Sequence, residues 1–322
     1  PDEIELKIEA LIDEDIKYEE SESIGRARRL NDATGRYIEF CKSSFPNDLN
    51  LRGLKIVVDA AHGAAYHVAP YVFKELGATV IPIGCSPDGF NINRNVGALY
   101  PEQLVATVNA QRADYGIALD GDADRIQMVD SRGNIYNGDE LLYAIILERR
   151  QRMEIKGVAG TLMTNFGLEK RLKDLGIPLE RAKVGDRYVL EALHQNGWYF
   201  GGESSGHLLC LDCHTTGDGI IAALQVLTAV VRSGKTLREL THDLKMYPQV
   251  MINVPLKPGL DWQNHAELQR VRAEVEAELG DRGRVLIRAS GTEPILRLMV
   301  EAETHELAKR GIERLADVSL DA

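Results

Sequence analysis

Apolar residues near the start of the chain recur at helical spacing between positions 4 and 12. This pattern predicts a short amphipathic helix, whose apolar side needs another surface to cover it. A second helix is expected over residues 25–45, because Pro46 would end it. We interpret residues 1–24 as the remaining helix of a preceding domain, which itself is missing from the sequence.

Short β-branched runs alternate with helix-like stretches over residues 25–135. The runs at residues 55–59 and 79–83 enclose a helical stretch, which predicts a βαβ unit with a right-handed crossover. Two further apolar strands, expected at residues 115–119 and 126–130, enclose an acidic loop. We expect this segment to form one α/β domain.

The same alternation begins again over residues 136–248, although the two segments share no repeat at the level of residues. Helices are expected at residues 140–149, 188–196 and 219–232, with strands between them. This pattern predicts a second consecutive α/β domain, of similar size to the first.

A β-α-β-β-α pattern follows over residues 249–322. Its first helix is expected at residues 266–279, where the apolar residues share one face and Gly280 ends the pattern. Strands are expected at residues 284–288 and 295–302. The pattern predicts a smaller C-terminal α+β domain with a core of its own.

Composition narrows the class of protein. Hydrophobic residues make up 44% and charged residues 27% of the 322 residues, as in an ordinary globular protein. The formal net charge of −11 argues against general nucleic-acid binding, which requires a positive surface. Apolar runs fall short of the roughly 20 residues that cross a bilayer, and no secretory signal pattern opens the chain. We therefore expect a cytoplasmic protein with neither a membrane nor a nucleic acid as partner.

The cysteines also indicate a cytoplasmic protein. Four of them in a chain of this length do not make a disulfide framework, which fits a reducing compartment. Cys210 and Cys213 form a C-x-x-C with a histidine on either side, a spacing compatible with zinc or redox chemistry. Because the stretch is apolar and a second ligand pair is lacking, we interpret both as core residues.

The sharpest chemical motif is the loop Leu119-Asp-Gly-Asp-Ala-Asp-Arg125, which follows an apolar strand. The carboxylates of Asp120, Asp122 and Asp124 can converge there on one hard cation. Mg²⁺ fits best, because it accepts few carboxylates and keeps positions open for phosphate oxygens. Arg125 offers a planar fork to a phosphoryl group. The alternative is a solvated acidic turn.

Two other metal-loop classes can be compared with this motif. A calcium-binding EF-hand would need Gly and Glu where the chain has Arg125 and Ser131, so that class is excluded. An aspartyl-phosphate phosphatase would use Asp120 as nucleophile and Asp122 as acid. It expects Thr or Val where this chain has Asp124, and it stays open as an alternative.

A second motif, Gly-Gly-Glu-Ser-Ser-Gly-His, lies between two expected strands. Its glycines permit close approach of a ligand to the backbone, and Glu203, Ser205 and His207 offer polar groups for sugar hydroxyls. A turn of small polar residues explains it equally well. Lys183 and Asp186, at a strand-to-helix junction, are weaker candidates, since Asp186 is also a suitable helix N-cap.

The third motif is Arg288-Ala-Ser-Gly-Thr-Glu-Pro294. Successive backbone N–H groups in such a turn can form an anion-binding nest, to which the hydroxyls of Ser290 and Thr292 add donors. Arg288 and Arg297, on the next strand, would add charge-assisted contacts to a phosphate. A β-hairpin turn with surface arginines is the alternative.

With these three motifs in this order, the sequence resembles the α-D-phosphohexomutase family over essentially its whole length. The family patterns are a D-G-D-x-D-R metal loop, a G-E-x-S-G-H sugar loop and an R-x-S-G-T-E-P phosphate loop. Residues 33–40, 183–189 and 215–219 are most similar to a bacterial branch that interconverts glucosamine 6-phosphate and glucosamine 1-phosphate for cell-wall precursors. The resemblance implies mixed sheets in the two α/β domains.

The resemblance also implies what is missing. The family has four domains, and the first carries a serine that is phosphorylated within a T/S-A-S-H-N-P loop. The 322 residues contain no such loop. We therefore expect this chain to be inactive by itself and to need the missing N-terminal domain of the same protein. Many family members have glycine in place of Ala123, and the extra methyl group of an alanine is tolerable there if the local backbone φ is negative.

In the mechanism that the resemblance implies, phosphoryl groups are exchanged through a bisphosphorylated sugar, which also acts as activator. Mg²⁺ would be held by the three aspartates, with Arg125 beside the transferring group. Glu203, Ser205 and His207 would contact the sugar. The phosphate that does not react would be held by a set of five residues: Arg288, Ser290, Gly291, Thr292 and Arg297.

The sequence leaves the sugar open among glucosamine, glucose and mannose. It also leaves the oligomeric state open, although the resemblance implies a possible homodimer. A protein that binds a phosphosugar without catalysis is the hypothesis from another class.

Overall fold

The computed structural model describes residues 2–257, 260–290 and 293–318. The chain forms two compact units, residues 1–36 and 37–322. In the first unit, α1 (Asp2–Ile12) is followed by a segment without regular structure. The apolar side chains of α1, Ile4 and Ile8 among them, are exposed within the structure.

The prediction of a helix over residues 25–45 is wrong at its start. The helix is α2 (Ala33–Ser43), and residues 25–32 lie outside any helix. The apolar Leu30 in that stretch is exposed, so it provides no packed face, and short helices need such packing to be stable. In α2, by contrast, Ile38 and Cys41 are buried.

The first sheet has the strand order β2-β1-β3-β4-β5. The central strand β1 is parallel to β2 and β3, whereas β4 is antiparallel to both β3 and β5. Successive residues of β1 contribute to opposite faces, Ile56 and Val58 to one core and Val57 to another. The elements of this region are β1 (Lys55–Asp59), α3 (Ala69–Glu75), β2 (Thr79–Ile83), α4 (Glu102–Gln111), β3 (Tyr115–Leu119), β4 (Ile126–Asp130) and β5 (Ile135–Tyr136).

The second sheet repeats this arrangement with the order β7-β6-β8-β9. Its central strand β6 is parallel to β7 and β8, and β9 is antiparallel to β8. The two sheets thus share a topology that the residues did not indicate. The elements are α5 (Gly138–Arg149), β6 (Val158–Thr161), α6 (Phe166–Asp174), β7 (Leu179–Ala182), α7 (Asp186–Asn196), β8 (Phe200–Gly202), β9 (Leu208–Cys210), α8 (Gly219–Ser233) and α9 (Leu237–Leu240).

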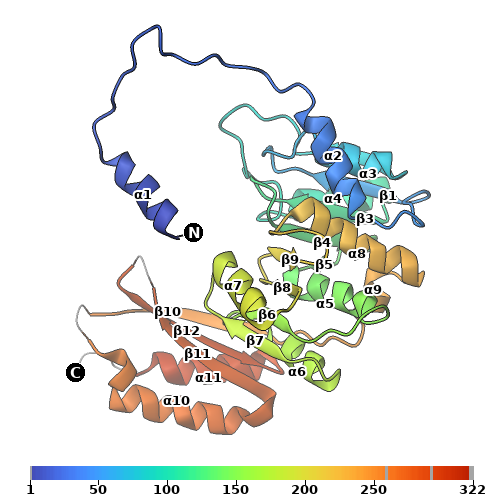
Figure 1. Ribbon diagram of the computed structural model, residues 1–322. Coiled ribbons are helices and arrows are strands. Elements are labelled where there is room, and N and C mark those ends of the chain that lie inside the picture. Colours follow the sequence, from blue (N-terminus) through green and yellow to red (C-terminus); the bar gives the residue numbers. More distant parts are fainter. Residues whose placement is uncertain (1, 258–259, 291–292, 319–322) are drawn as a thin grey trace. The chain divides into compact units, whose positions relative to one another are not determined.

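Two buried helices join these sheets into one continuous core. Most residues of α5 and α8 are buried, and the two helices pack on each other between strands of both sheets (Figure 1). Local signals fix where they begin. Asn137 and Glu140 form a reciprocal capping box on α5, and Asp218 accepts hydrogen bonds from the first turn of α8. Cys210 belongs to this core and Cys213 packs against it, as the sequence predicted.

The third sheet is antiparallel, with the order β10-β12-β11, and has a separate core. The predicted face of α10 is buried, including Leu268 and Val275. The elements are β10 (Gln249–Pro255), the 3₁₀ turn η1 (Trp262–Asn264), α10 (Ala266–Leu279), the 3₁₀ turn η2 (Gly280–Arg282), β11 (Gly283–Ala289), β12 (Ile295–Ala302) and α11 (His305–Ala316). The mixed sheets and the smaller C-terminal α+β region confirm the predicted fold class. Among the described residues, no helix is both long and apolar enough to cross a membrane.

Candidate metal centre

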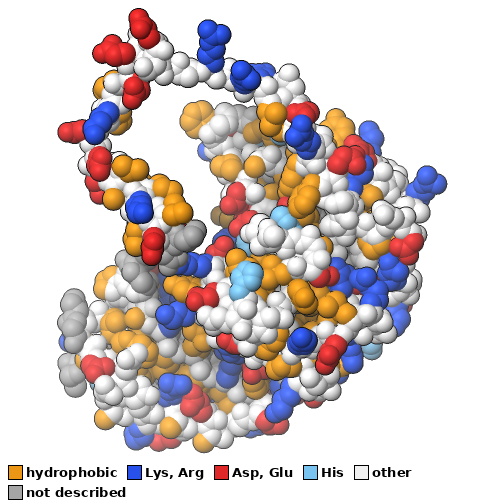
Figure 2. All heavy atoms as spheres, viewed as in Figure 1, with side chains coloured by type: hydrophobic (Ala, Val, Ile, Leu, Met, Phe, Trp, Pro, Cys, Tyr) orange, Lys and Arg blue, Asp and Glu red, His pale blue; other side chains and the backbone are white. Residues whose placement is uncertain are grey.

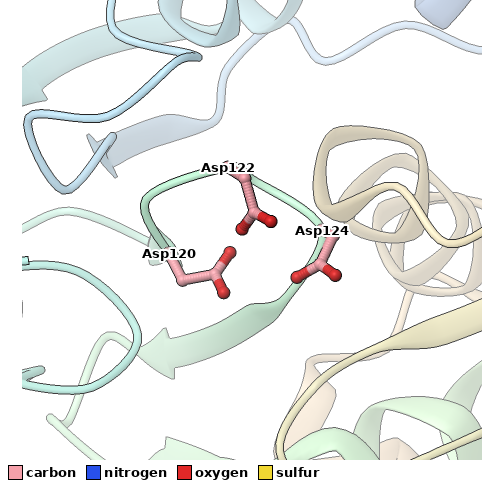
Figure 3. Close-up of side chains that lie close together, drawn as sticks. All are labelled: Asp120, Asp122 and Asp124. Carbon is pink, nitrogen blue, oxygen red and sulfur yellow. The ribbon is translucent and has the colours of Figure 1, made fainter. Parts of the chain in front are cut away.

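Three carboxylates gather in the loop between β3 and β4. One oxygen of each of Asp120, Asp122 and Asp124 lies within 4.8 Å of the other two. The three side chains point toward one another across the loop (Figure 3). Asp120 is buried, Asp124 is half-buried and Asp122 is exposed. The cluster is therefore closed on the side of the sheet and open on the side of Asp122.

The backbone of the loop turns back on Asp120. Its carboxylate accepts a hydrogen bond from the N–H of Arg125 at 3.1 Å, and its carbonyl accepts one from Ala123 at 3.1 Å. The negative φ that would make an alanine tolerable at position 123 is not found, since φ of Ala123 is +65°. This left-handed conformation favours glycine and is costly for alanine. The Ala123 carbonyl accepts a hydrogen bond from Gly219 at 2.8 Å, so the first residue of α8 helps to hold the turn.

The guanidinium of Arg125 lies between two of the carboxylates. Its Nε is 3.9 Å from an oxygen of Asp120 and 3.8 Å from an oxygen of Asp124. Burial raises the pKa of Asp120, and the nearby charges of Asp124 and Asp122 raise it further. Positive charge in the loop therefore stabilises the ionised carboxylates.

Two buried polar atoms in the loop lack a hydrogen-bond partner among the described residues. They are Oδ1 of Asp124 and Nε of Arg125. Such atoms are costly to bury unless a ligand satisfies them. An all-oxygen set of three carboxylates is also the donor chemistry that Mg²⁺ prefers. The residues present therefore fit a divalent cation beside an anionic group.

The metal loop and the predicted sugar loop are in direct contact. The backbones of Arg125 and His207 form an isolated β-bridge, and the N–H of Ile126 donates to the Gly206 carbonyl at 3.1 Å. Nδ1 of His207 lies 3.1 Å from Oδ2 of Asp124. The histidine is buried, and the ring is confined on its far side by Gly217, where an added Cβ would collide with Nε2. Two loops from different sheets are thus in direct contact.

The weaker candidates lie beside the sugar loop. The carboxylate of Glu203 accepts a hydrogen bond from the backbone N–H of Gly185 at 3.1 Å. This contact brings the loop that carries Lys183 and Asp186 next to Glu203. Both of these residues and Ser205 are exposed. Asp186 is the first residue of α7 and not its N-cap, because that position is taken by Gly185 with φ +132°.

The predicted phosphate loop joins β11 and β12. Arg288 and Arg297 face each other across these strands. Burial lowers the pKa of Arg288, and the charge of Arg297 lowers it further; Nε of Arg297 is buried without a hydrogen-bond partner among the described residues. Ser290 accepts a hydrogen bond from the N–H of Glu293 at 3.3 Å. The expected contributions of Gly291 and Thr292 lie outside the described residues.

Sequence reasoning missed a second loop against the metal loop. At the end of β1, the buried Asp59 accepts hydrogen bonds from the N–H groups of Ala61 at 2.9 Å and Gly97 at 2.8 Å. The turn that follows donates from Ala64 to the Gly121 carbonyl at 2.8 Å. An added Cβ on Gly63 would collide with that carbonyl. The signal in the sequence was Asp59 as the last residue of a buried strand, followed directly by small residues.

Models of one protein family match most of the chain. The model described as phosphoglucomutase/phosphomannomutase alpha/beta/alpha domain II matches residues 35–133. The models of alpha/beta/alpha domain III and of the C-terminal domain match residues 137–247 and 251–318.

Known proteins give a consistent result. A phosphoglucosamine mutase of Bordetella pertussis is 68% identical over 317 residues, which cover 98% of this chain and 70% of that protein. A solved phosphoglucomutase/phosphomannomutase family protein of Burkholderia thailandensis has a TM-score of 0.72 at 23% identity, over 87% of this chain and 62% of that one. An Aspergillus fumigatus N-acetylphosphoglucosamine mutase, in complex with GlcNAc-6P and magnesium, has a TM-score of 0.66 at 22% identity, over 87% and 69%. The similarity to these two solved structures is a similarity of fold alone.

Proposed function

This chain belongs to the phosphoglucomutase/phosphomannomutase family, and on that premise we propose that it carries the metal, sugar and phosphate sites of a phosphoglucosamine mutase. Such an enzyme is an isomerase that interconverts glucosamine 6-phosphate and glucosamine 1-phosphate. The observation that carries the proposal is the contact between Asp124 of the acidic cluster and His207 of the sugar loop. The proposed cation site and a polar loop suited to hydroxyl groups are in contact there, which supports phosphoryl transfer on a sugar.

The proposed roles follow from where the side chains lie. Asp120, Asp122 and Asp124 hold Mg²⁺, which when bound supplies positive charge beside the transferring phosphoryl group. Arg125, whose Nε has no hydrogen-bond partner among the described residues, donates to the same group. Charge that develops during the transfer is then neutralised by groups already in place.

The sugar and the second phosphate are assigned to other loops. The carboxylate of Glu203 accepts hydrogen bonds from sugar hydroxyls, with Ser205, His207, Lys183 and Asp186 as neighbours in this proposal. Arg288, Ser290 and Arg297 bind the phosphate that is not reacting. In this proposal, Gly291 and Thr292 also contribute to this phosphate site. Burial lowers the pKa of Arg288, and the charge of Arg297 lowers it further. An anion between the two guanidinium groups would stabilise both charges, which supports this role.

The exchanged phosphoryl group requires a phosphoserine in this mechanism. The serine donates its phosphoryl to one sugar hydroxyl, the resulting bisphosphate reorients, and its other phosphoryl returns to the serine. The T/S-A-S-H-N-P loop of the family is not found in the 322 residues. We therefore propose that these residues bind the phosphosugar and Mg²⁺ but do not turn the substrate over by themselves. We also propose that the protein is cytoplasmic and forms a homodimer.

A coupled assay for glucosamine 1-phosphate formation tests this function. It compares the 322-residue chain with a version extended upstream through the encoded start, with Mg²⁺, glucosamine 6-phosphate and catalytic amounts of bisphosphate. Activity is expected only in the extended protein, and glucose and mannose 6-phosphates are expected to react more slowly. Turnover by the 322 residues alone would contradict the proposal and make Asp120 the first candidate for a nucleophile.

Binding of metal to the 322 residues can be measured without turnover. Titration calorimetry with Mg²⁺ is expected to show one weak site that Asp122→Asn weakens further, by roughly tenfold or more, because one of three charged ligands becomes neutral. Asp88→Asn is the matched control, since Asp88 is an exposed aspartate outside the cluster. Equal binding by both variants would place the metal elsewhere.

A further inference from the structure

The segment that leads from β9 into α8 touches both loops of the proposed site. An added Cβ on Gly217 would collide with Nε2 of His207. Two residues further on, the N–H of Gly219 donates to the carbonyl of Ala123 in the metal loop at 2.8 Å. We call residues 214–219 the supporting segment, because the metal loop and the sugar loop both rest on it.

The metal loop fills the space around the end of the supporting segment. An added Cβ on Gly219 would lie 2.8 Å from the carbonyl oxygen of Arg125 and 2.9 Å from that of Ala123. The N–H of Ala123 in turn donates to the carbonyl of Asp120 at 3.1 Å. Packing this close transmits small displacements. A shift of the supporting segment therefore moves the backbone that carries the three carboxylates.

Asp218 fixes the supporting segment at the start of α8. Its Oδ1 accepts hydrogen bonds from the N–H groups of Ile220 at 2.8 Å and Ile221 at 2.9 Å, which makes it the N-cap of the helix. Asp218 is only 8% exposed, and a buried carboxylate needs hydrogen-bond donors to offset the loss of water. The donor to its second oxygen, Oδ2, is the hydroxyl of Tyr37.

Helix α2 presents this hydroxyl to Asp218. Ile38, next to Tyr37, is buried in the core. Burial raises the pKa of Tyr37, and the charge of Asp218 raises it further, so the hydroxyl stays protonated and remains a donor. The ring of Phe40 packs edge-on against the ring of His214, with the centroids 5.2 Å apart. Helix α2 thus contacts the supporting segment at two places.

We propose that Tyr37 is a positioning residue for the metal loop and acts through Asp218. This inference rests on the proposed metal site and extends it to a residue outside the three sequence motifs. The hydroxyl of Tyr37 orients the carboxylate of Asp218, and that carboxylate fixes the first turn of α8. Gly219, at the start of this turn, holds the carbonyl of Ala123, whose left-handed backbone lets the loop turn back on itself.

A mild substitution tests the role of the hydroxyl. Helix α2 lies at the surface, where Figure 2 shows hydrophobic side chains among charged ones, and Tyr37 is 37% exposed. Tyr37→Phe removes the hydroxyl and keeps the ring. The affinity of the 322-residue chain for Mg²⁺, measured by titration calorimetry, is expected to fall about three- to tenfold. Circular dichroism verifies that each variant is fully folded under the conditions of the titration.

Ile38→Val is the matched control. It removes one buried methylene group from the same helix, so it is expected to lower the urea midpoint of unfolding. Because Ile38 makes no hydrogen bond to Asp218, the affinity for Mg²⁺ is expected to stay unchanged. A residue that only stabilises the fold would lower the midpoint without changing the affinity, and this comparison separates the two roles.

A double variant tests whether Tyr37 acts through Asp218. Asp218→Ala removes the acceptor of the hydrogen bond and is itself expected to weaken Mg²⁺ binding. Adding Tyr37→Phe to Asp218→Ala is expected to cause no further loss of affinity, because the partner of the hydroxyl is already gone.

Three outcomes would overturn the proposal. They are an unchanged Mg²⁺ affinity in Tyr37→Phe, an equal loss of affinity in Ile38→Val, and additive losses in the double variant. The first of these would leave the proposed metal site standing and remove only the role of Tyr37. Absence of Mg²⁺ binding by the unchanged chain would overturn the metal site and the role of Tyr37 together.

Discussion

Nδ1 of His207 lies 3.1 Å from Oδ2 of Asp124. Because a carboxylate only accepts hydrogen bonds, this contact places the imidazole proton on Nδ1. One residue comes from the hairpin of the second sheet and the other from the metal loop of the first sheet. The orientation of a candidate metal ligand therefore depends on how the two sheets are packed, and hydrogen bonds of this kind commonly tune the affinity of a metal site.

We predict that Gly217→Ala weakens Mg²⁺ binding although Gly217 touches no carboxylate. The new Cβ would collide with Nε2 of His207, so the ring must move and its contact with Asp124 is lost. The expected loss of Mg²⁺ affinity is about tenfold, measured by calorimetry. Gly35→Ala is the matched control, because nothing lies within 4 Å of a Cβ at Gly35. Unchanged affinity in Gly217→Ala would mean that His207 does not orient Asp124.

The second prediction concerns the left-handed residue of the metal loop. Ala123 has φ +65°, a conformation that costs an L-residue about 1–2 kcal/mol. A glycine at this position removes that cost. It also makes the unfolded chain more flexible, which offsets part of the gain in stability. Ala123→Gly is therefore expected to leave the unfolding free energy unchanged or to raise it by up to about 1 kcal/mol. The same change at Ala110, an exposed residue of α4, is expected to lower it by about 1 kcal/mol. Urea unfolding of both variants measures the difference, and losses of equal size would refute the strain at Ala123.

The third prediction concerns a buried ion pair between the neighbouring strands β11 and β12 of the third sheet. Glu301 is 0% exposed and accepts from Nε of Arg284 at 2.6 Å and from the N–H of Phe166 at 2.8 Å. Arg284 also donates to the carbonyls of Leu162 and Thr164, at 2.8 and 2.9 Å. Glu301→Ala is expected to cost about 3–5 kcal/mol, because it leaves a buried guanidinium without its carboxylate.

The exposed pair formed by Arg272 and Glu276, with 39% and 42% of the side chains exposed, supplies the control. Glu276→Ala is expected to cost less than about 0.5 kcal/mol. Thermal unfolding midpoints of both variants are compared under the same conditions. Similar shifts in the two variants would show that the buried pair adds nothing to the attachment of the third sheet.

The sequence predictions that the structure confirms rest on strong local patterns. The buried strands around the acidic loop, the face of α10 and the order of the α/β elements follow from runs of apolar residues. The helix α4 escaped prediction because only Leu104 and Val108 of its residues are buried. The contact of His207 with Asp124 and the positive φ of Ala123 depend on packing between segments far apart in the chain. Such contacts leave no periodic pattern in the sequence.

The last prediction concerns the pH dependence of stability. Asp139, in the first turn of α5, is 1% exposed. One of its oxygens accepts a hydrogen bond from the N–H of Asn165 at 2.8 Å, and the other has no partner among the described residues. Burial raises the pKa of Asp139 to about 7, with a smaller contribution from Glu301 in the same direction, while Arg181 and the Asn165 N–H lower it.

The sign of the effect follows from the protons bound in each state. In the unfolded chain Asp139 loses its proton near its ordinary pKa of 3.8, whereas the folded chain keeps the proton until about pH 7. Between these values the folded state binds one more proton, so stability falls as the pH rises, by about 1.4 kcal/mol per pH unit. Asp139→Asn removes this titration and keeps the shape of the side chain. The variant is therefore expected to gain roughly 2–3 kcal/mol relative to the unchanged chain between pH 5 and pH 8, measured by urea unfolding at both pH values. Asp281→Asn, an exposed aspartate, is expected to show no such gain, and a constant difference for Asp139→Asn across this range would mean that Asp139 is ionised in the folded protein throughout.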